Sequence, residues 1–289
     1  MLTRFKAKRG RPPAVKLMPL TNRTARHIDL RTFDEALRKL LAGSSKLRLA
    51  AGSVGPDLLI SGRLHEMNDN AGGATLQSCL LGLTLLHVET TEKLWLGVHR
   101  ARKLIESSQT KQGSQVKVSR RKLDETIDLS GHFNDSDATA VASAAAKDML
   151  GTALARHRPP HIVRFYPLRN RTSEHIDTRL ILAQLESLVL RSGKVRVVAS
   201  PEDAQDARDV RAEAARTASD ATLPAAGQEL GSTCVVTGRI TSTSTADADS
   251  TMTQYVVAFE AVDADDNTKL WAMSKAINKI VQRAAPPAR

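Results

Sequence analysis

Two histidines are each followed, two residues later, by an aspartate, and both pairs lie in a phrase that occurs twice in the chain. Residues 22–31 read NRTARHIDLR and residues 170–179 read NRTSEHIDTR, so seven of ten positions agree at an offset of 148 residues. A histidine close to a carboxylate can act as a general base, which makes His27 and His175 candidates for catalysis. General base catalysis also requires a nucleophile or a group that polarises the substrate. No G-x-S-x-G motif, reactive-cysteine signature or metal motif accompanies the pairs, so the sequence predicts no enzyme.

A structural role explains the same residues better. In each copy a helical pattern begins just after the aspartate, so Asp29 and Asp177 are expected to cap free amides at the start of a helix. The histidine before each of them is expected to fill the joint between a strand and that helix. The phrase would then be part of the frame of the fold.

Residues 22–24 and 170–172 also fit the pattern of an N-glycosylation acceptor, as do residues 134–136. An asparagine that follows a strand ending in Pro-Leu commonly bonds its own backbone in a turn, so a turn is favoured over glycosylation. That interpretation leaves Arg171 and Arg179 free to face a partner. The phrase is kept as a candidate site, either as a structural joint or as a partner surface, made of Asn22, Arg23, Thr24, His27, Asp29, Asn170, Arg171, Thr172, His175, Asp177 and Arg179.

The elements around the phrase follow the same order in both copies. An extended apolar piece ending in proline precedes it, over residues 14–20 and 161–168, and alternation in these pieces predicts strands with one buried face. Apolar residues at helical spacing follow over residues 33–41 and 181–189, and a second short strand comes after each helix. Their apolar faces are expected to pack on a sheet.

Beyond these elements the offset rises from 148 to 176 residues, because the second copy carries 28 extra residues between about 201 and 231. An Ala-rich, charged stretch there predicts an exposed helix, and a shorter helical piece is expected around residues 228–230. The first copy lacks both, so one covering helix is missing from it. Three strands in an antiparallel meander then follow in each copy. Trp95 and Trp271 begin the last strand of each meander, where packing is favoured over ligand stacking.

A further segment, residues 128–155, precedes the second copy and predicts a turn and an Ala-rich helix capped at Ser136 or Asp137. No counterpart precedes the first copy, because Met1 comes too soon. Either the first copy never had this helix, or the natural chain starts further upstream.

Composition sets limits on the partners. The 289 residues include 42 Lys and Arg against 31 Asp and Glu, and the net charge of +11 favours acidic partners through non-specific attraction. Much of the excess lies in two stretches that are expected to solubilise a tail and a linker. Almost no aromatic residues accompany these stretches, so no specific nucleic-acid binding is predicted.

Cys79 and Cys234 lie in apolar runs and are expected to be buried free thiols, although an oxidising compartment would allow a disulfide. No cofactor and no metal site are predicted.

The second half of the sequence resembles a known family. DLSGHFNDSDATAVA, IVRFYPLRNRTSEHIDTRLI, SGKVRVVAS, ELGSTCVVTGRITS and YVVAFEAVDADDNTKLW are similar, in order and spacing, to the LpoB-type penicillin-binding protein activators. The resemblance implies a non-catalytic periplasmic module, usually anchored to the outer membrane by a lipid, that docks on a bifunctional peptidoglycan synthase and stimulates it. It also implies a fold related to the N-terminal domain of TolB. The printed sequence shows neither the apolar segment of a signal peptide nor a lipid-accepting cysteine near its start.

The expected fold class is therefore α/β (α+β), with two tandem modules, each a small mixed sheet with an antiparallel meander flanked by helices. Residues 1–106 are expected to form a trimmed module, 107–123 a basic polar linker, 124–283 a complete module and 284–289 a tail.

Three functions compete on this basis. The first is a cell-envelope activator or adaptor that works by binding a protein partner and shifting it between states. The second is a structural or assembly module of an envelope or secretion system, in which the two copies cover one another or pack on neighbouring chains. The third is a basic protein that binds an acidic polymer, for which binding would weaken steeply with added salt.

Overall fold

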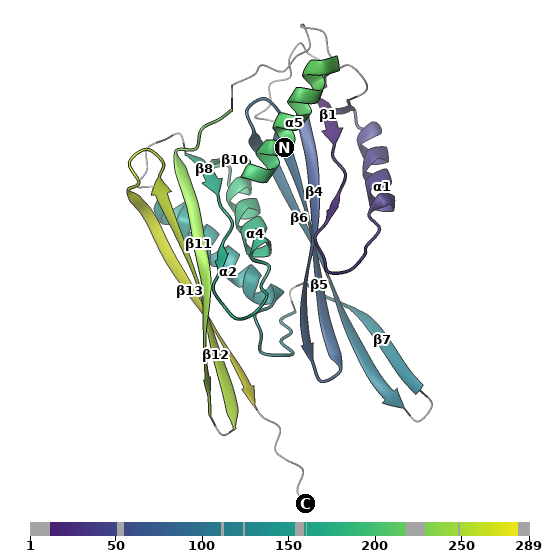
Figure 1. Ribbon diagram of the computed structural model, residues 1–289, viewed down its shortest axis with the longest axis vertical. Coiled ribbons are helices and arrows are strands. Elements are labelled where there is room, and N and C mark those ends of the chain that lie inside the picture. Colours follow the sequence, from purple (N-terminus) through teal and green to yellow (C-terminus); the bar gives the residue numbers. More distant parts are fainter. Residues whose placement is uncertain are drawn as a thin grey trace, which may run out of the picture.

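The protein is a mixed α+β fold built on one large twisted sheet, which confirms the predicted fold class. The computed structural model describes residues 12–50, 55–110, 113–123, 125–153, 159, 161–217, 229–247 and 249–282. Below, the first half means residues 12–123 and the second half residues 125–282. Figure 1 shows the second half on the left and the first half on the right.

The first half opens with short strands and one helix and ends in long antiparallel strands. Its elements are β1 (Ala14–Leu17), β2 (Thr21–Asn22), α1 (Arg31–Ala42), β3 (Arg48–Leu49), β4 (Leu58–Ala71), β5 (Ala74–His87), β6 (Glu92–Thr110) and β7 (Gly113–Arg121). Strand β1 pairs in parallel with β3 and β4, and the chain then runs antiparallel from β4 to β5, β6 and β7.

The second half begins with an extra helix and then uses the same order of elements. They are α2 (Asp135–Asp148), a π-helical turn (Met149–Ala153), β8 (Ile162–Phe165), β9 (Arg169–Asn170), α4 (Thr178–Arg191), β10 (Arg196–Val198), α5 (Pro201–Thr217), β11 (Cys234–Ala246), β12 (Ser250–Asp263) and β13 (Lys269–Gln282). Strand β8 pairs in parallel with β10 and β11, as β1 does with β3 and β4. The predicted strand, helix, strand and meander are therefore present in both halves.

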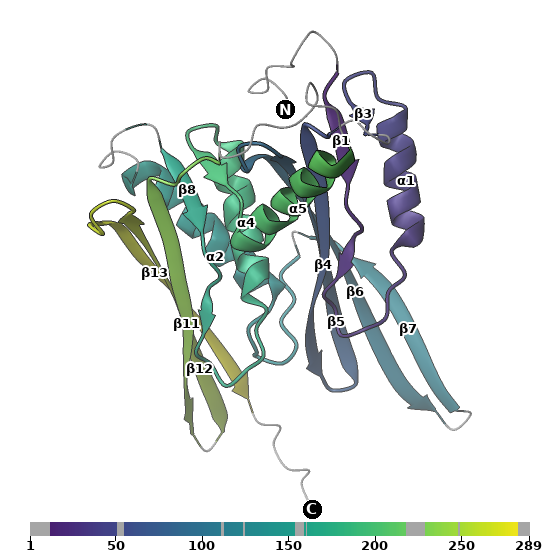
Figure 2. The same ribbon diagram turned by 45° about the horizontal axis from the view of Figure 1, so that its top comes forward.

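The two halves share one sheet because their edge strands pair with each other. Strand β10 runs antiparallel to β6, with Val197 opposite Lys93 and Val198 opposite Glu92. The resulting strand order is β13-β12-β11-β8-β10-β6-β5-β4-β1-β3, with β7 paired to β6 outside this path. In Figures 1 and 2 the helices α2, α4 and α5 lie between the two arms of this sheet, whereas α1 lies alone on the far side of the first half.

The helix inserted in the second half covers the first half. Ala204, Ala207 and Val210 of α5 are buried in one cluster with Leu59 of β4 and Leu86 of β5. The neighbouring residues of β4, such as Leu58 and Ile60, face the other way and pack towards α1. The covering helix that the first copy lacks in its own sequence is thus supplied by the second copy.

The main core lies in the second half, where α2 and α4 pack on the sheet. The larger buried side chains of this cluster are Phe133, Met149, Phe165, Ile181, Leu185, Ile240, Tyr255, Phe259 and Trp271. Trp271 stacks on Phe259 with ring centroids 6.4 Å apart, and its indole nitrogen donates to Asp148 Oδ2 at 2.6 Å. The packing role expected for Trp271 is confirmed.

Some local predictions were wrong. Residues 107–123, expected as a linker, hold the end of β6 and all of β7, which pair as a hairpin.

The cap of α2, expected at Ser136 or Asp137, is Asn134. Its Oδ1 accepts hydrogen bonds from the backbone nitrogens of Ser136 and Asp137, while the Asp137 carboxylate accepts the backbone N–H of Asn134 at 2.9 Å. Residues 229 and 230 of the expected short helix are not helical, and residue 228 lies outside the described residues. Both cysteines are free; Cys234 is buried but Cys79 is only half-buried.

Candidate functional site

Both copies of the repeated phrase form the same turn. Asn22 Oδ1 accepts hydrogen bonds from the backbone nitrogen and the hydroxyl of Thr24 at 2.9 and 2.8 Å, and its Nδ2 donates to the Arg26 carbonyl. Asn170 does the same with Thr172, at 3.0 and 2.8 Å, and with the Glu174 carbonyl. The asparagine therefore organises its own loop, as expected of a turn former.

The histidines of the phrase do not fill a joint, contrary to the expectation from sequence. His27 and His175 are both exposed. Each aspartate of the phrase pairs with the arginine two residues later instead: Asp29 with Arg31, and Asp177 with an arginine in the first turn of α4. In both copies the aspartate also accepts the backbone nitrogen of that arginine, at the start of the helix.

Asp177 is a cap that also joins the two halves. Its Oδ1 accepts the backbone nitrogen of Arg179 at the start of α4, and its Oδ2 lies 2.8 Å from Nδ1 of His65, a buried residue of β4. Burial alone would raise the pKa of Asp177, but hydrogen bonds from His65 and Arg179 lower it to about 2. Among the described residues, Asp29 has no such partner from the other half. The N-cap position of α1 is Leu30, whose side chain makes no capping hydrogen bond.

The two copies of the phrase meet at this place. A hollow of about 490 Å³ between the halves is lined by Arg23 and Thr24 of the first copy and by His175, Asp177 and Arg179 of the second. The guanidinium group of Arg23 reaches α5, where it pairs with Glu202 at 2.6 Å. The phrase is thus a joint between the halves of the chain as well as between a strand and a helix.

Replacing Asp177 with Asn is expected to destabilise the protein in a pH-dependent way. Because the folded pKa lies below the ordinary 3.8, the carboxylate stabilises the fold fully above about pH 4, and that contribution is lost as the pH falls towards 2. At pH 7 the variant should lose about 1–2 kcal/mol, because a shift of the pKa from 3.8 to about 2 corresponds to about 2 kcal/mol of stabilisation of the charged form, which Asn lacks. Urea unfolding at pH 7 and pH 2.5 checks this, because the difference from the parent protein should shrink at the lower pH. Asp29→Asn, at the same position of the other copy, should show a smaller difference at pH 7.

Beside the phrase, a network of buried charges holds the halves together. Lys93 of β6 lies 2.6 Å from Glu186 of α4 and 3.3 Å from Asp203 of α5, and Asp203 in turn pairs with Arg63 of β4 at 2.5 Å. Two cations and two carboxylates are therefore balanced across the joint. Burial opposes the charge of Asp203, yet Lys93 and Arg63 hold its pKa at about 2. These four residues lie in no motif, so the sequence did not single them out.

The start of α2 is also anchored on the first half. The buried Arg102 of β6 donates from Nε to Asp135 at 2.9 Å and from Nη2 to the Ser136 hydroxyl at 3.0 Å. The carboxylate of Asp69, on β4, accepts the backbone nitrogens of Leu129 and Ser130. Neither half therefore completes its polar contacts alone.

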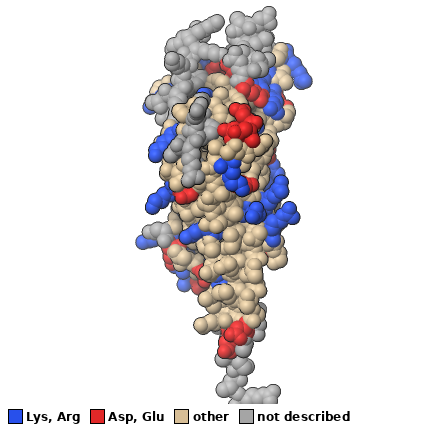
Figure 3. Space-filling model, turned by 90° about the vertical axis from the view of Figure 1, so that its left-hand side faces the viewer, with Lys and Arg blue, Asp and Glu red and all other residues tan. Residues whose placement is uncertain are grey.

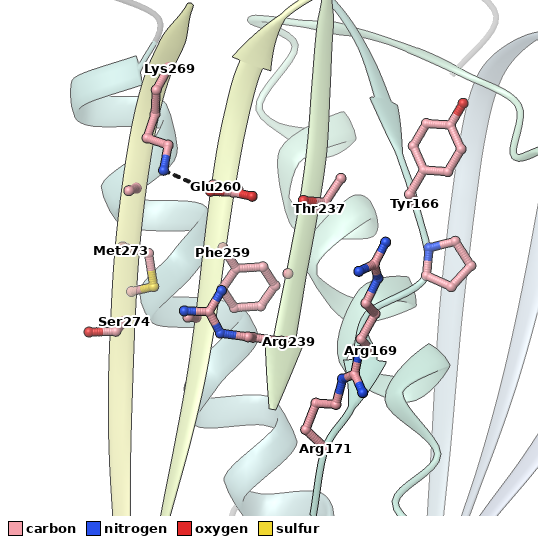
Figure 4. A pocket seen from close by; sticks show the side chains of 14 residues that line it. Tyr166, Arg169, Arg171, Thr237, Arg239, Phe259, Glu260, Lys269, Met273 and Ser274 are labelled. Atoms are coloured by element: carbon pink, nitrogen blue, oxygen red, sulfur yellow. Dashed lines mark ion pairs between the residues drawn. The ribbon is translucent and has the colours of Figure 1, made fainter. Parts of the chain in front are cut away.

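The outer face of the second half is open and basic. A shallow hollow of about 870 Å³ lies on β11, β12 and β13 beside β9, and Figure 4 shows Arg169, Arg171, Arg239 and Lys269 around it. Lys269 pairs with Glu260 at 2.9 Å, and this hydrogen bond lowers the pKa of Glu260. Among the described residues, Arg169, Arg171 and Arg239 form no ion pair, and all three are exposed.

Figure 3 views the molecule from the left-hand side of Figure 1, where the second half lies. Charged side chains gather over its upper part, and the tapering lower part is mostly uncharged. Tyr166, exposed to 38%, adds an aromatic ring at the rim of the hollow. Exposed arginine and tyrosine are side chains that protein interfaces favour. Of the residues proposed from sequence, Arg171 is the one that reaches this surface, whereas Arg179 lies at the joint.

Within the described ranges, no group of three or more His, Cys, Asp or Glu side chains is arranged to hold a metal ion. None of the helices that the structure describes is long and apolar enough to cross a membrane.

Residues 137–277 match a protein-family model whose description is peptidoglycan-synthase activator LpoB. The solved structures that are similar to the chain include the following three. The LpoB C-terminal domain from Salmonella enterica is 14% identical, with 49% of this chain and 98% of that domain covered and a TM-score of 0.30. The LpoB C-terminal domain from Escherichia coli is 14% identical, with 49% of this chain and 98% of that domain covered and a TM-score of 0.29. Lipoprotein GNA1162 from Neisseria meningitidis is 17% identical, with 42% of this chain and 83% of that protein covered and a TM-score of 0.27. No curated protein matches the chain by sequence.

Proposed function

We propose, from the match of residues 137–277 to the model of the LpoB peptidoglycan-synthase activators, that the chain is a non-enzymatic activator of the cell envelope. It binds a bifunctional peptidoglycan synthase directly and stimulates it, as a periplasmic or outer-membrane-associated protein. The match of the second half to the activator family is the observation that carries this proposal.

The open basic face supports a binding role. Arg169, Arg171 and Arg239 are exposed side by side and unpaired within the described residues, so their charges are available to an acidic surface on a partner. Activation by binding requires that this surface favour one state of the synthase over another. No reaction at the surface is needed for that effect.

The test uses the purified full chain and a bifunctional peptidoglycan synthase of the same organism. Addition of the chain should raise glycan polymerisation and crosslinking, and binding should saturate and weaken as salt rises. Reversing two charges with Arg169→Glu and Arg171→Glu together should weaken binding at least about tenfold, since close charge pairs at interfaces are worth more than about 1.4 kcal/mol.

A matched control separates the local surface from the net charge. Lys117→Glu with Arg120→Glu makes the same change in net charge on the exposed β7 hairpin, and it should leave binding nearly unchanged. Absence of binding, together with unaltered synthase activity, would reject the proposal. An equal loss of binding affinity in the two double variants would show that the binding site does not lie on the basic face.

A structural or assembly role is the second candidate. It is favoured by one observation, an apolar sheet face of the first half that no described helix other than α1 covers. Light scattering tests self-assembly, for which a monomer at all concentrations would count against this role.

A further inference from the structure

The first half lacks a helix over a sheet face that is covered in the second half. Ile240, Val257 and Phe259 are buried under α2 and α4, with exposures of 0%, 0% and 2%. Their counterparts at the offset of 176 residues are three leucines, which are only half-buried. The apolar pattern of the strands is the same, but the cover is absent.

Helix α1 shows the same difference. In α4, Ile181 is fully buried, whereas its counterpart Phe33 in α1 is 42% exposed. Leu40, near the end of α1, is 74% exposed against 37% for its counterpart Leu188 in α4, and none of the residues of α1 is fully buried. Helix α2 packs closely along α4. In Figures 1 and 2 none of the described helices lies in the corresponding place beside α1.

The polar contacts of α2 indicate which kind of helix would fit the open face of the first half. Lys279 of β13 holds the start of α2, with Nζ 2.6 Å from Asp128 and 2.8 Å from Asp137. Trp271 donates to Asp148 at the end of α2. Both partners on α2 are carboxylates, and the face between them is Ala and Val.

The first half keeps the matching groups without their partners. The counterpart of Lys279 is Lys103, which is exposed and forms no ion pair with any described residue. The counterpart of Trp271 is Trp95, a half-buried ring that lies over Gly97. The ammonium group of Lys103 at one end of the face and the indole N–H of Trp95 at the other are therefore available to a helix with carboxylates at its start and near its end, as in α2.

We propose that this open face is a docking groove for an amphipathic, Ala-rich helix of another protein, with carboxylates at its start and one near its end. The groove is defined by Leu64, Leu81, Leu83, Trp95 and Lys103. Charge complementarity to Lys103 identifies the acidic start of the helix. The chain's own α2 is already buried in the second half, and residues 1–11 carry five Lys and Arg but no Asp or Glu, so they do not offer the acidic start.

This interaction goes beyond the proposed function, because it concerns a different surface in a different half. It does not depend on whether the chain activates a synthase. The helix-in-groove mode needs only an apolar stripe on the ligand and a preformed apolar trough.

A synthetic peptide of residues 128–150 is the probe, because it carries the apolar face and the acidic residues of α2. Added to the full chain, it should bind with one-to-one stoichiometry and gain helix content. Binding should quench or shift the fluorescence of Trp95, measured in a Trp271→Phe background. Lys103→Glu should weaken binding at least about tenfold, consistent with the loss of a close charge pair, whereas Lys117→Glu on the exposed β7 strand should not.

A disulfide trap locates the peptide. Phe133 contacts Tyr255 with ring centroids 5.6 Å apart, and the counterpart of Tyr255 in the first half is the free Cys79. A peptide with Phe133→Cys, activated as a thiopyridyl disulfide, should therefore exchange with the Cys79 thiolate and release thiopyridine. Burial raises the pKa of Cys79, so the trap is run at about pH 8.5, where more of the thiolate is present. The Cys79→Ser variant should not be trapped.

Two results would overturn the proposal. Failure of the peptide to bind at millimolar concentration would show that the docking groove does not exist. A peptide that binds equally well to the parent protein and to Lys103→Glu, and is not trapped at Cys79, would have displaced α2 in the second half. A concentration-dependent dimer of the chain that is lost in Lys103→Glu would assign the groove to a second copy instead of another protein.

Discussion

Replacing Lys93 with Met is expected to lower the free energy of unfolding by about 3–5 kcal/mol, the usual cost of breaking a buried ion pair. Lys93 is only 4% exposed and lies between the carboxylates of Glu186 and Asp203. Met keeps the length of the side chain but removes the charge, which leaves both carboxylates buried beside a single cation, Arg63. Urea unfolding at pH 7 measures the change.

The repeat offers a matched control for this substitution. Lys269 occupies the same position on β13, but it is exposed and pairs with the partly exposed Glu260. Lys269→Met should therefore change the free energy of unfolding by less than about 1 kcal/mol. Equal effects of the two substitutions would show that the buried charges do not join the halves.

Introducing a carboxylate into the buried face of α5 is expected to have an effect of similar size. Ala207 is fully buried against Leu59 and Leu86 of the first half. Ala207→Asp would either bury an unpaired charge, which costs several kcal/mol, or force α5 off the first half. We expect a loss of at least about 3 kcal/mol in the free energy of unfolding, measured by urea unfolding, with faster proteolysis within α5.

Ala212, exposed on the same helix, provides the control, because Ala212→Asp adds the same charge outside the contact. Its effect should stay within about 0.5 kcal/mol. If Ala207→Asp were equally mild, α5 would not be the cover of the first half.

Much of the fold follows from local patterns in the sequence. The alternation in residues 14–20 and 161–168 and the helical spacing from Phe33 and Ile181 predict the strand and helix of each half, which the structure contains. The change of offset from 148 to 176 residues marks the insertion that becomes α5. These features are encoded by neighbouring residues, so they can be read without knowledge of tertiary contacts.

Other features depend on contacts that no local pattern specifies. The apolar stripe of Ala204, Ala207 and Val210 predicts that α5 packs on something, but the stripe is the same whichever half it covers. The β7 hairpin was missed because its basic residues suggested a solvated linker, although Val116 and Val118 alternate with polar residues as in a strand. The pairing of β10 with β6 leaves no signal in either strand.

The candidate site divides in the same way. The turn made by Asn22 and Asn170 follows from its residue types and position after a strand. The contact of Asp177 with His65 joins residues that are 112 positions apart, and no sequence pattern near either residue predicts it. For the same reason, the exposed arginines of β9 and β11 come together only in the folded sheet.

The central claim is that the two halves form one cooperative unit, joined by a shared sheet and a buried ion network. The chain has one tryptophan in each half, at equivalent positions of the repeat, so Trp95→Phe and Trp271→Phe leave a reporter in one half at a time. Equilibrium urea unfolding followed by the fluorescence of each variant is expected to coincide with the loss of circular dichroism in that same variant, in a single transition. A transition at Trp95 that is separate from the one at Trp271, with circular dichroism following both in two steps, would contradict the account.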